Sequence, residues 1–302
     1  MKVIGFGDNI VDRFLDRKVM YPGGNCVNVA VFAHRLGIES AYLGVFGSDP
    51  LGAFVRNAID SEGVDTSKCI IRDGLNGVTE IKVVDGDRIF LGWNEGGVTT
   101  SDPFMLDVEH LRYLASADLV HSSVYSASET QLPAVRSTGA LVSFDYSSEP
   151  ERRSDSYLEL TAPYVDLALL SCGNMTVAAV EHDLRRVHAA GVPLAVGTRG
   201  QSGAMMYDGE RFLTQAAAPT DPRRFADTMG CGDAFLAGLV VNLLGSGWSR
   251  TYRPPADALQ RALARGAEHA AAQCYVEGAF GYGRAVEAAL VVEGATSRAG
   301  SN

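Results

Sequence analysis

The sequence has few cysteines, few lysines and no long hydrophobic run. Its five cysteines are scattered and include no Cys-x-x-Cys pair, which argues against a disulfide framework and against a zinc site. No uninterrupted apolar stretch is long enough to cross a bilayer, and no basic and apolar leader opens the chain. We therefore expect a cytoplasmic protein with no membrane partner.

Basic residues are outnumbered as well. The chain has 26 lysines and arginines against 36 aspartates and glutamates, so its formal net charge at pH 7 is −10. A surface of this sign repels the phosphates of nucleic acids and of anionic lipids. We expect no nucleic-acid partner, and any bound phosphate requires a local arrangement of donors.

Several catalytic motifs are also missing. No lysine follows a glycine, which excludes the Gly-Lys-Ser or Gly-Lys-Thr of a P-loop. A nucleophile elbow, the protein-kinase signatures and His-Glu-x-x-His are absent, and the histidines lack metal-ligand spacing. The Gly-Phe-Gly at residues 5–7 lacks the third glycine and the following helix of a dinucleotide-binding fingerprint. We interpret His121, at the end of a predicted strand, as a core histidine rather than a pocket residue.

The length and the hydrophobic content are those of one large domain. The chain has 302 residues, of which 46% are hydrophobic, enough for a sizeable core. Predicted strands alternate with predicted helices from residue 107 onward, which is typical of a doubly wound α/β sheet. The predicted strands cover residues 2–7, 41–46, 119–121, 141–144, 166–170 and 193–196. The predicted helices include residues 50–62, 108–115, 129–136, 177–188 and 256–273.

Residues 78–93 have a different pattern. They alternate with period two on both sides of a central Asp-Gly-Asp turn, which predicts a β-hairpin. A two-faced hairpin does not fit a buried parallel sheet. We interpret it, together with residues around 13–22, as a small β lid over a substrate; the alternative is an exposed edge hairpin.

Polar residues and a glycine motif follow the first predicted strand. Asp8, Asn9 and Asp12 come just after residues 2–7, where open parallel sheets present their ligand groups. Residues 23–30 read Gly-Gly-Asn-Cys-Val-Asn-Val-Ala, and the two asparagines lie on one face of the first helical turn. Their amides are suited to binding hydroxyls. The alternative is a capped helix that begins after a glycine turn.

A second glycine turn opens a later helix at residues 227–235, which read Asp-Thr-Met-Gly-Cys-Gly-Asp-Ala-Phe. Backbone N–H groups of Gly230, Cys231 and Gly232 at a helix start would face a bound anion. Asp233 would sit in the first turn, where we expect its carboxylate to be ionised and able to take a proton. The alternative is an ordinary glycine turn with an acidic cap. We expect Cys231 to be sensitive to alkylation and the other cysteines to be small core residues.

Both motifs resemble the two signatures of the ribokinase-like (PfkB) carbohydrate kinases. The resemblance covers nearly the whole chain and implies a three-layer α/β/α domain with a mostly parallel doubly wound sheet and a small β lid. It also makes a homodimer through the lid a candidate assembly. The implied organisation is a kinase domain at 1–292, lid segments inserted at about 13–22 and 78–95, and a flexible tail at 293–302.

The resemblance also assigns roles to residues. It implies that Asp233 is the catalytic base and that Gly230, Cys231 and Gly232 form the anion hole. The implied sugar-binding residues are Asp8, Asn9, Asp12, Gly23, Gly24 and Asn28. The implied nucleotide-binding residues are Gly197, Thr198, Gly200, Asp227, Thr228, Ala279 and Gly281.

The implied cofactors are ATP and Mg²⁺, with a monovalent cation as a further candidate. Many relatives carry an Asn-x-x-Glu motif that helps to organise Mg²⁺, whereas residues 171–174 here read Ser-Cys-Gly-Asn. We therefore name no protein ligand for the metal, which would arrive as its complex with ATP.

Within the family, several strings resemble the fructoselysine 6-kinases and related fructosamine kinases. These are Gly-Asp-Asn at 7–9, Tyr-Pro-Gly-Gly-Asn at 21–25, Gly-Asp-Arg at 86–88, Glu-Gly at 95–96, Asp-Leu-Val-His at 118–121 and Ser-Phe-Asp-Tyr-Ser at 143–147. The implied reaction transfers the γ-phosphate of ATP to a primary hydroxyl of a sugar or a sugar-amine adduct. Acids such as Glu80, Glu95 and Asp145 are candidate partners for the amine cation, although solvated surface acids are the alternative.

Two other functions stay open on the sequence. One is another sugar or nucleoside kinase of the same fold, of the ribokinase, fructokinase or adenosine kinase type. The other is a non-catalytic sugar-binding regulator, which would require damage to Asp233 or to the glycine turn before it. Both are intact.

Overall fold

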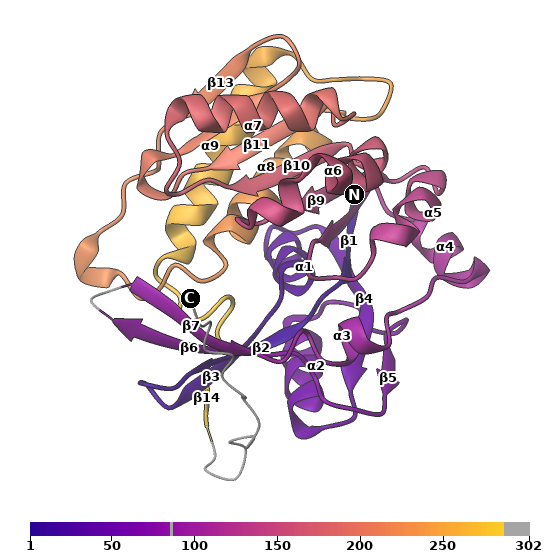
Figure 1. Cartoon of the computed structure of the whole chain (residues 1–302), viewed down its shortest axis with the longest axis vertical. Coiled ribbons are helices and arrows are strands. Elements are labelled where there is room, and N and C mark those ends of the chain that lie inside the picture. The colour runs from indigo at the N-terminus through magenta and orange to yellow at the C-terminus, as the bar shows by residue number, and fades with distance from the viewer. Residues whose placement is uncertain (85–86, 287–302) are drawn as a thin grey trace, which may run out of the picture.

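The computed structural model describes residues 1–84 and 87–286 of the chain (Figure 1). Its described strands form a nine-stranded sheet and a five-stranded sheet. Figure 1 shows the smaller sheet beside one end of the larger one, at the lower left. The strands of the larger sheet, the main sheet, are β1 Lys2–Gly7, β4 Glu39–Gly47, β5 Ile70–Arg72, β8 Leu119–Ser123, β9 Leu141–Asp145, β10 Leu167–Ser171, β11 Leu194–Thr198, β12 Ala204–Tyr207 and β13 Phe212–Gln215.

The main sheet is mostly parallel. Its order is β13-β12-β11-β10-β9-β8-β1-β4-β5, and every neighbouring pair from β11 to β5 is parallel. Only β12 and β13 run antiparallel to their neighbours. Because parallel strands end at the same edge, the residues that follow β1, β8, β9 and β10 meet on one side of the molecule.

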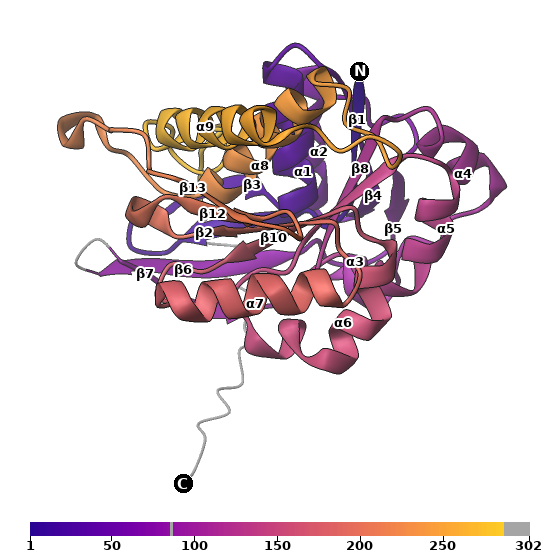
Figure 2. The same cartoon turned by 90° about the horizontal axis from the view of Figure 1, so that it is seen from above.

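Helices cover both faces of the main sheet (Figure 2). Helices α4, α5, α6 and α7 pack on one face, and α1, α8 and α9 pack on the other. Successive strand residues point to opposite faces, so Ile4 of β1 joins the first core and Val3 joins the second. The helices are α1 Asn25–Arg35, α2 Pro50–Glu62, α3 Val98–Ser101, α4 Val108–Leu114, α5 Leu132–Ser137, α6 Asp155–Thr161, α7 Val177–Ala189, α8 Cys231–Gly245 and α9 Ala256–Gln273. Short 3₁₀ turns are η1 Glu129–Gln131, η2 Pro150–Arg153, η3 Ala162–Tyr164, η4 Gly200–Ser202 and η5 Pro222–Arg224.

Helix α8 lies in the middle of the second core. Its sequence is apolar all round, which is typical of a helix that is buried on every side, and it packs against both α1 and α9. Asp233 is the one charged residue in this helix. The position of α8 therefore brings a carboxylate into the interior at the start of a buried helix.

The five-stranded sheet, the small sheet, has the order β14-β3-β2-β6-β7. Segments 13–22 and 78–95 both contribute to it, and β6 and β7 form the antiparallel hairpin that the alternation predicts. Its side chains pack around Phe14, Tyr21 and Ile81. The use of this sheet as a lid, and a contact with a second subunit through it, stay predictions. Its strands are β2 Ile10–Phe14, β3 Val19–Gly23, β6 Val78–Val84, β7 Asp87–Trp93 and β14 Arg284–Ala285.

The predicted fold class is confirmed, because a mostly parallel sheet lies between two layers of helices. The short elements β5, α6 and β14 were not predicted, since two to seven residues carry little periodic pattern. The predicted tail at 293–302, residues 287–292 of the predicted domain and the centre of the hairpin turn at 85–86 lie outside the described residues. Among the described residues, no helix has the length and apolar character needed to span a bilayer.

Candidate active site

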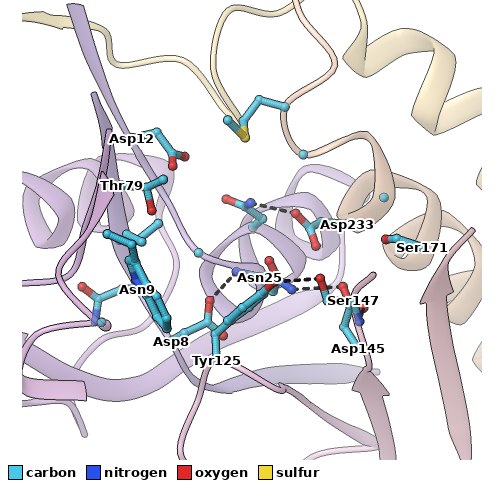
Figure 3. A pocket seen from close by; sticks show the side chains of 18 of the residues that line it. Asp8, Asn9, Asp12, Asn25, Thr79, Tyr125, Asp145, Ser147, Ser171 and Asp233 are labelled. Carbon is cyan, nitrogen blue, oxygen red and sulfur yellow. Dashed lines mark hydrogen bonds between the residues drawn. The ribbon is translucent and has the colours of Figure 1, made fainter. Parts of the chain in front are cut away.

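A cavity of about 710 Å³ lies where the carboxyl edge of the main sheet faces the small sheet (Figure 3). Its walls also include the first turns of α1 and α8. The described lining contains five carboxylates and no lysine, arginine or histidine. The acids are Asp8, Asp12, Asp145, Glu149 and Asp233.

Strand ends account for this clustering. Asp8 follows β1, Tyr125 follows β8, Asp145 is the last residue of β9 and Ser171 is the last residue of β10. These strands are neighbours in the main sheet, so residues far apart in the sequence share one wall of the cavity. The first turn of α8 then places Asp233 among them (Figure 3).

Asp233 is the third residue of α8 and is only 7% exposed. Its Oδ2 atom accepts a hydrogen bond from Nδ2 of Asn28 in α1 at 2.8 Å. The predicted base and one of the predicted sugar-binding residues are therefore in direct contact. This contact fixes the orientation of the carboxylate at the cavity wall.

The helix start does not keep the pKa of Asp233 low, contrary to the expectation from the sequence. Burial, followed by the negative charges of Asp145, Asp8 and Asp12, raises the pKa of the Asp233 carboxyl well above its ordinary range, and the hydrogen bond from Asn28 offsets this only in part. Removing a carboxylate from water costs more than the partial charge of one helix end returns.

The turn before Asp233 is held by backbone geometry and by Asp227. Gly230 precedes α8 with φ 72°, and a Cβ there would lie 3.2 Å from the Cα of Ala279. Oδ1 of Asp227 accepts hydrogen bonds from the backbone N–H groups of Thr228 at 2.7 Å and Met229 at 3.1 Å. Asp227, predicted as a nucleotide contact, therefore shapes this turn in the structure.

The three amides predicted as an anion hole are not equivalent. The N–H of Cys231 donates to the carbonyl of Thr228 at 3.2 Å within the turn. The N–H of Gly232 belongs to the first turn of α8, where no intrahelical acceptor exists. Thr228, Gly230 and Gly232 line the cavity, whereas Cys231 does not. Its sulfur lies 3.5 Å from that of Cys274, and all five cysteines are free thiols.

Asp8 lines the cavity, and both of its carboxylate oxygens also accept hydrogen bonds from other segments of the protein. Its Oδ2 accepts a hydrogen bond from the N–H of Asn25 at 2.6 Å, which satisfies the start of α1. Its Oδ1 accepts from the hydroxyl of Ser123, the last residue of β8, at 2.7 Å and from that of Ser126, just after β8, at 2.9 Å. The carboxylate thus joins three segments at the cavity wall.

Among the described residues, two buried amide oxygens have no hydrogen-bond partner. Oδ1 of Asn28 is one, and Oδ1 of Asn9 is the other. Their nitrogens are engaged, since Asn9 donates to the hydroxyl of Tyr42 at 2.9 Å and to the carbonyl of Val45 at 2.6 Å. Both residues line the cavity and are less than 5% exposed. Buried acceptors without a partner are rare in proteins, and the described residues supply no donor for these two oxygens.

The glycines at the start of α1 leave room for their neighbours. A Cβ on Gly24, which has φ 114°, would lie 2.7 Å from the Cα of Asn9. A Cβ on Gly23 would lie 2.8 Å from Oδ2 of Asp12. Gly24 and Asp12 line the cavity, and Gly23 does not.

The residues predicted to bind the nucleotide lie mostly beyond this cavity. Only Thr228 is part of its lining. Gly197 and Thr198 lie at the end of β11, next to β10, and Gly197 is buried against Val180 of α7. Their contact with a nucleotide, like that of Gly200, Asp227, Ala279 and Gly281, stays a prediction.

One residue that the sequence analysis missed holds the loop at 278–281 against the turn. Nε2 of Gln273, the last residue of α9, donates to the carbonyls of Met229 and Gly278 at 3.1 Å each, and to that of Ala279. Nothing in the sequence singled out this amide. It ties the predicted nucleotide-binding loop to the turn before Asp233.

The ends of β8, β9 and β10 supply further residues that were missed. Tyr125, Ser147, Glu149 and Ser171 line the cavity. The same rule that selected Asp8, a polar residue after a strand, would have found them. His121, by contrast, is fully buried with Nδ1 2.9 Å from the Ser143 hydroxyl, and burial lowers its pKa to about 4. Its interpretation as a core histidine is confirmed.

Of the three acids predicted to meet an amine, only Asp145 lines the cavity. Its Oδ2 accepts from Nδ2 of Asn25 at 3.0 Å and its Oδ1 from the N–H of Ser147 at 2.7 Å. Burial and the nearby charge of Asp8 raise its pKa to about 7. Glu80 instead lies 3.9 Å from Arg13, and Glu95 is exposed.

The described residues of the site do not form a complete set of protein ligands for a metal ion. The described residues include no group of three His, Cys, Asp or Glu side chains able to hold one. Carboxylate and hydroxyl oxygens, the donors that Mg²⁺ prefers, do gather at the ends of β9 and β10, in Asp145 and Ser171. This donor set suits a metal ion whose remaining ligands are water and phosphate.

Several known proteins are similar to this chain in sequence or in fold. Fructosamine kinase FrlD of Bacillus subtilis (strain 168) is 36% identical over 285 residues, which are 94% of each chain. Fructoselysine 6-kinase of Escherichia coli (strain K12) is 31% identical over 91% of this chain and 97% of its own. The fold matches that of an Arabidopsis thaliana ribokinase solved with ribose and ATP, with a TM-score of 0.72 at 17% identity over 93% of this chain and 95% of the other.

A fructokinase from Xylella fastidiosa, solved with bound ATP, has a TM-score of 0.73 at 18% identity over 93% of this chain and 95% of its own. The model of the pfkB family carbohydrate kinases matches residues 15–280, which include the glycine turn and Asp233. With the cavity at the carboxyl edge of the sheet and a carboxylate at the mouth of α8, these matches show that the chain belongs to the pfkB family of carbohydrate kinases.

Proposed function

We propose that this protein transfers the γ-phosphate of ATP to a primary hydroxyl of a sugar-amine adduct of the fructoselysine type. The observation that carries the proposal is the buried carboxylate of Asp233, oriented by Asn28 at the start of α8. The names of the relatives that match over most of the chain support the substrate class. The anionic cavity supports it as well, because a fructosamine has an amine cation that a plain hexose lacks.

In this proposal the sugar lies between the main sheet and the small sheet. The partnerless Oδ1 atoms of Asn9 and Asn28 accept hydrogen bonds from its hydroxyls. Asp233 takes the proton of the attacking hydroxyl, and its Oδ1 is the receiving atom because Oδ2 is engaged by Asn28. A raised pKa suits this role, since a general base works best when its pKa approaches the working pH.

The first turn of α8 stabilises the transferred phosphoryl group. Its N–H groups and the positive end of the helix lie where negative charge builds up as the bond to the leaving phosphate breaks. Gly232 has no side chain to block this approach. Residues 197–200, 227–228 and 279–281 hold the rest of the nucleotide in this proposal.

Magnesium would enter with ATP and neutralise charge on the phosphates. Asp145 and Ser171, at the ends of β9 and β10, would bond to its water ligands. The protein's own part is to position the sugar hydroxyl against Asp233 and to hold the charge at the turn.

The proposal is tested with a panel of acceptors. Fructoselysine, fructose, ribose and adenosine are each supplied with MgATP, and ADP release is followed over time. We expect the highest kcat/KM with fructoselysine. A preference for adenosine would point to a nucleoside kinase, and sugar binding in calorimetry with no ADP release from any acceptor would point to a regulator; either result overturns the proposal.

A further inference from the structure

An aromatic contact joins the two sheets across the cavity. The rings of Trp93, in β7 of the small sheet, and Tyr125, after β8 of the main sheet, meet edge to face with centroids 6.1 Å apart. The hydroxyl of Tyr125 in turn bonds to Glu149 and lies 2.8 Å from the hydroxyl of Ser147. Leu91 lines the cavity from the same strand as Trp93. We call Leu91, Trp93, Tyr125 and Glu149 the arm wall.

The apolar side chains of the arm wall are partly exposed to solvent. Trp93 is 47% exposed and Leu91 is 51% exposed, although both line the cavity. Glu149, which is half-buried, places a carboxylate beside them. A plain hexose has neither a hydrocarbon chain nor a positive charge to match this combination. An alkylammonium group has both, and aromatic rings next to a carboxylate favour such cations.

The chemistry of a fructosamine determines which end of the molecule lies at Asp233 and which end points away from it. Its amine replaces the hydroxyl on C1, so its remaining primary hydroxyl is the one on C6, at the opposite end of the sugar. With that hydroxyl at Asp233, the amine and its alkyl arm extend away from α8.

Resting on the proposed function, we infer that the arm wall binds the alkylammonium arm of the substrate and sets the preference for sugar-amine adducts over free sugars. Glu149 faces the amine cation, and the side chains of Leu91 and Trp93 cover the methylene chain. Tyr125 orients Glu149 through its hydroxyl. The contact between Trp93 and Tyr125 makes this part of the site depend on the position of the small sheet.

Two synthetic acceptors separate charge from chain length. They are 1-deoxy-1-butylamino-fructose, which is cationic, and 1-O-butyl-fructose, which has a neutral arm of similar length. Glu149→Gln should lower the ratio of kcat/KM for the amine over the ether about tenfold, the usual size of one charge-assisted contact. Trp93→Ala should lower kcat/KM about fivefold for both butyl compounds relative to fructose, because both lose cover for the chain.

Glu151→Gln is the matched control, because it removes a carboxylate from the same segment at an exposed position outside the lining. It should leave all three acceptors unchanged. Tyr125→Phe keeps the ring but loses the bond to Glu149, so it should reproduce part of the charge effect and none of the chain effect. Circular dichroism and thermal melting confirm that each variant is folded.

The outcomes separate this inference from the proposed function. If the unmodified protein prefers plain fructose to every amine adduct, the proposed function fails and the arm wall fails with it. If it prefers the adducts but Glu149→Gln and Trp93→Ala change all acceptors by the same factor, the proposed function stands and the inference about the arm wall is wrong.

Discussion

Helices α1 and α8 both begin after a glycine with positive φ, and the first turns of both line the cavity. The two helices differ in how the backbone N–H groups of their first turns are capped. Neither helix has a side-chain cap from its own N-terminal residue. At α1 the carboxylate of Asp8 arrives from another segment and accepts the N–H of Asn25. At α8, Gly232 lines the cavity, and no carboxylate in the described part of the chain caps the start of the helix. A helix start becomes an anion site only where the protein does not supply the anion itself.

The comparison predicts that changes at α8 affect turnover and that changes at α1 affect stability. The largest effect is expected for Asp233→Asn. Because the amide cannot take the hydroxyl proton, kcat should fall by about 10³-fold to 10⁴-fold with little change in KM for either substrate. The measurement is steady-state ADP release with fructoselysine. Turnover within tenfold of the unmodified protein would contradict the assignment of the base.

Gly232→Ala tests the anion site without disturbing the fold. A Cβ at this position meets nothing within 4 Å, and alanine is a better helix former than glycine, so the melting temperature should be kept or raised. The methyl group would project where a phosphate must approach, so kcat should fall by about 10²-fold, as for loss of one oxyanion donor. Unchanged kcat would show that no phosphate comes this close.

Asp8→Ala tests the other helix. It removes the acceptor for Asn25 and for two buried serine hydroxyls, so the free energy of unfolding should fall by about 2–3 kcal/mol. The KM for MgATP should stay within about twofold. Denaturant titration measures the first quantity and initial rates measure the second. A variant of normal stability with a greatly raised KM for the sugar would instead support Asp8 as a direct sugar ligand.

The smallest effect is a shift in the pH profile. The charge of Asp145 helps to raise the pKa of Asp233, so Asp145→Asn should move the rising limb of kcat to lower pH by roughly one unit. The unmodified protein should also lose stability as pH rises from the ordinary carboxyl pKa of about 4 to about 7, because the folded state holds its protons more tightly there. Asp145→Asn should flatten that decline. If the rising limb of the kcat profile stays at the same pH in Asp145→Asn, the carboxylates of Asp145 and Asp233 are not coupled.

Much of the predicted fold and site came from patterns among residues that are close together in the sequence. The alternation of strand and helix patterns requires only neighbouring residues, and it predicted a mostly parallel sheet between two helix layers correctly. The two glycine motifs were also readable, because a helix start needs few residues to define it. These motifs led to Asp233 and Asn28, which the structure brings into contact at 2.8 Å.

Contacts between distant segments were beyond such reasoning. Asp8 reads as a sugar ligand in the sequence, and only its distance from Asn25 and the two serines shows what its oxygens accept. The meeting of Trp93 with Tyr125 depends on how the small sheet is placed. Gln273 has no local pattern at all, although it joins two loops of the site.

The sequence by itself determined the class of fold, the two helix starts and the identity of the buried acid. Only the tertiary structure decided the direction in which the pKa of that acid is shifted and which helix start is left for a ligand. The physical reason is that periodicity and glycine turns are properties of adjacent residues, whereas desolvation, carboxylate repulsion and the capping of α1 by Asp8 arise when strands distant in the chain end side by side.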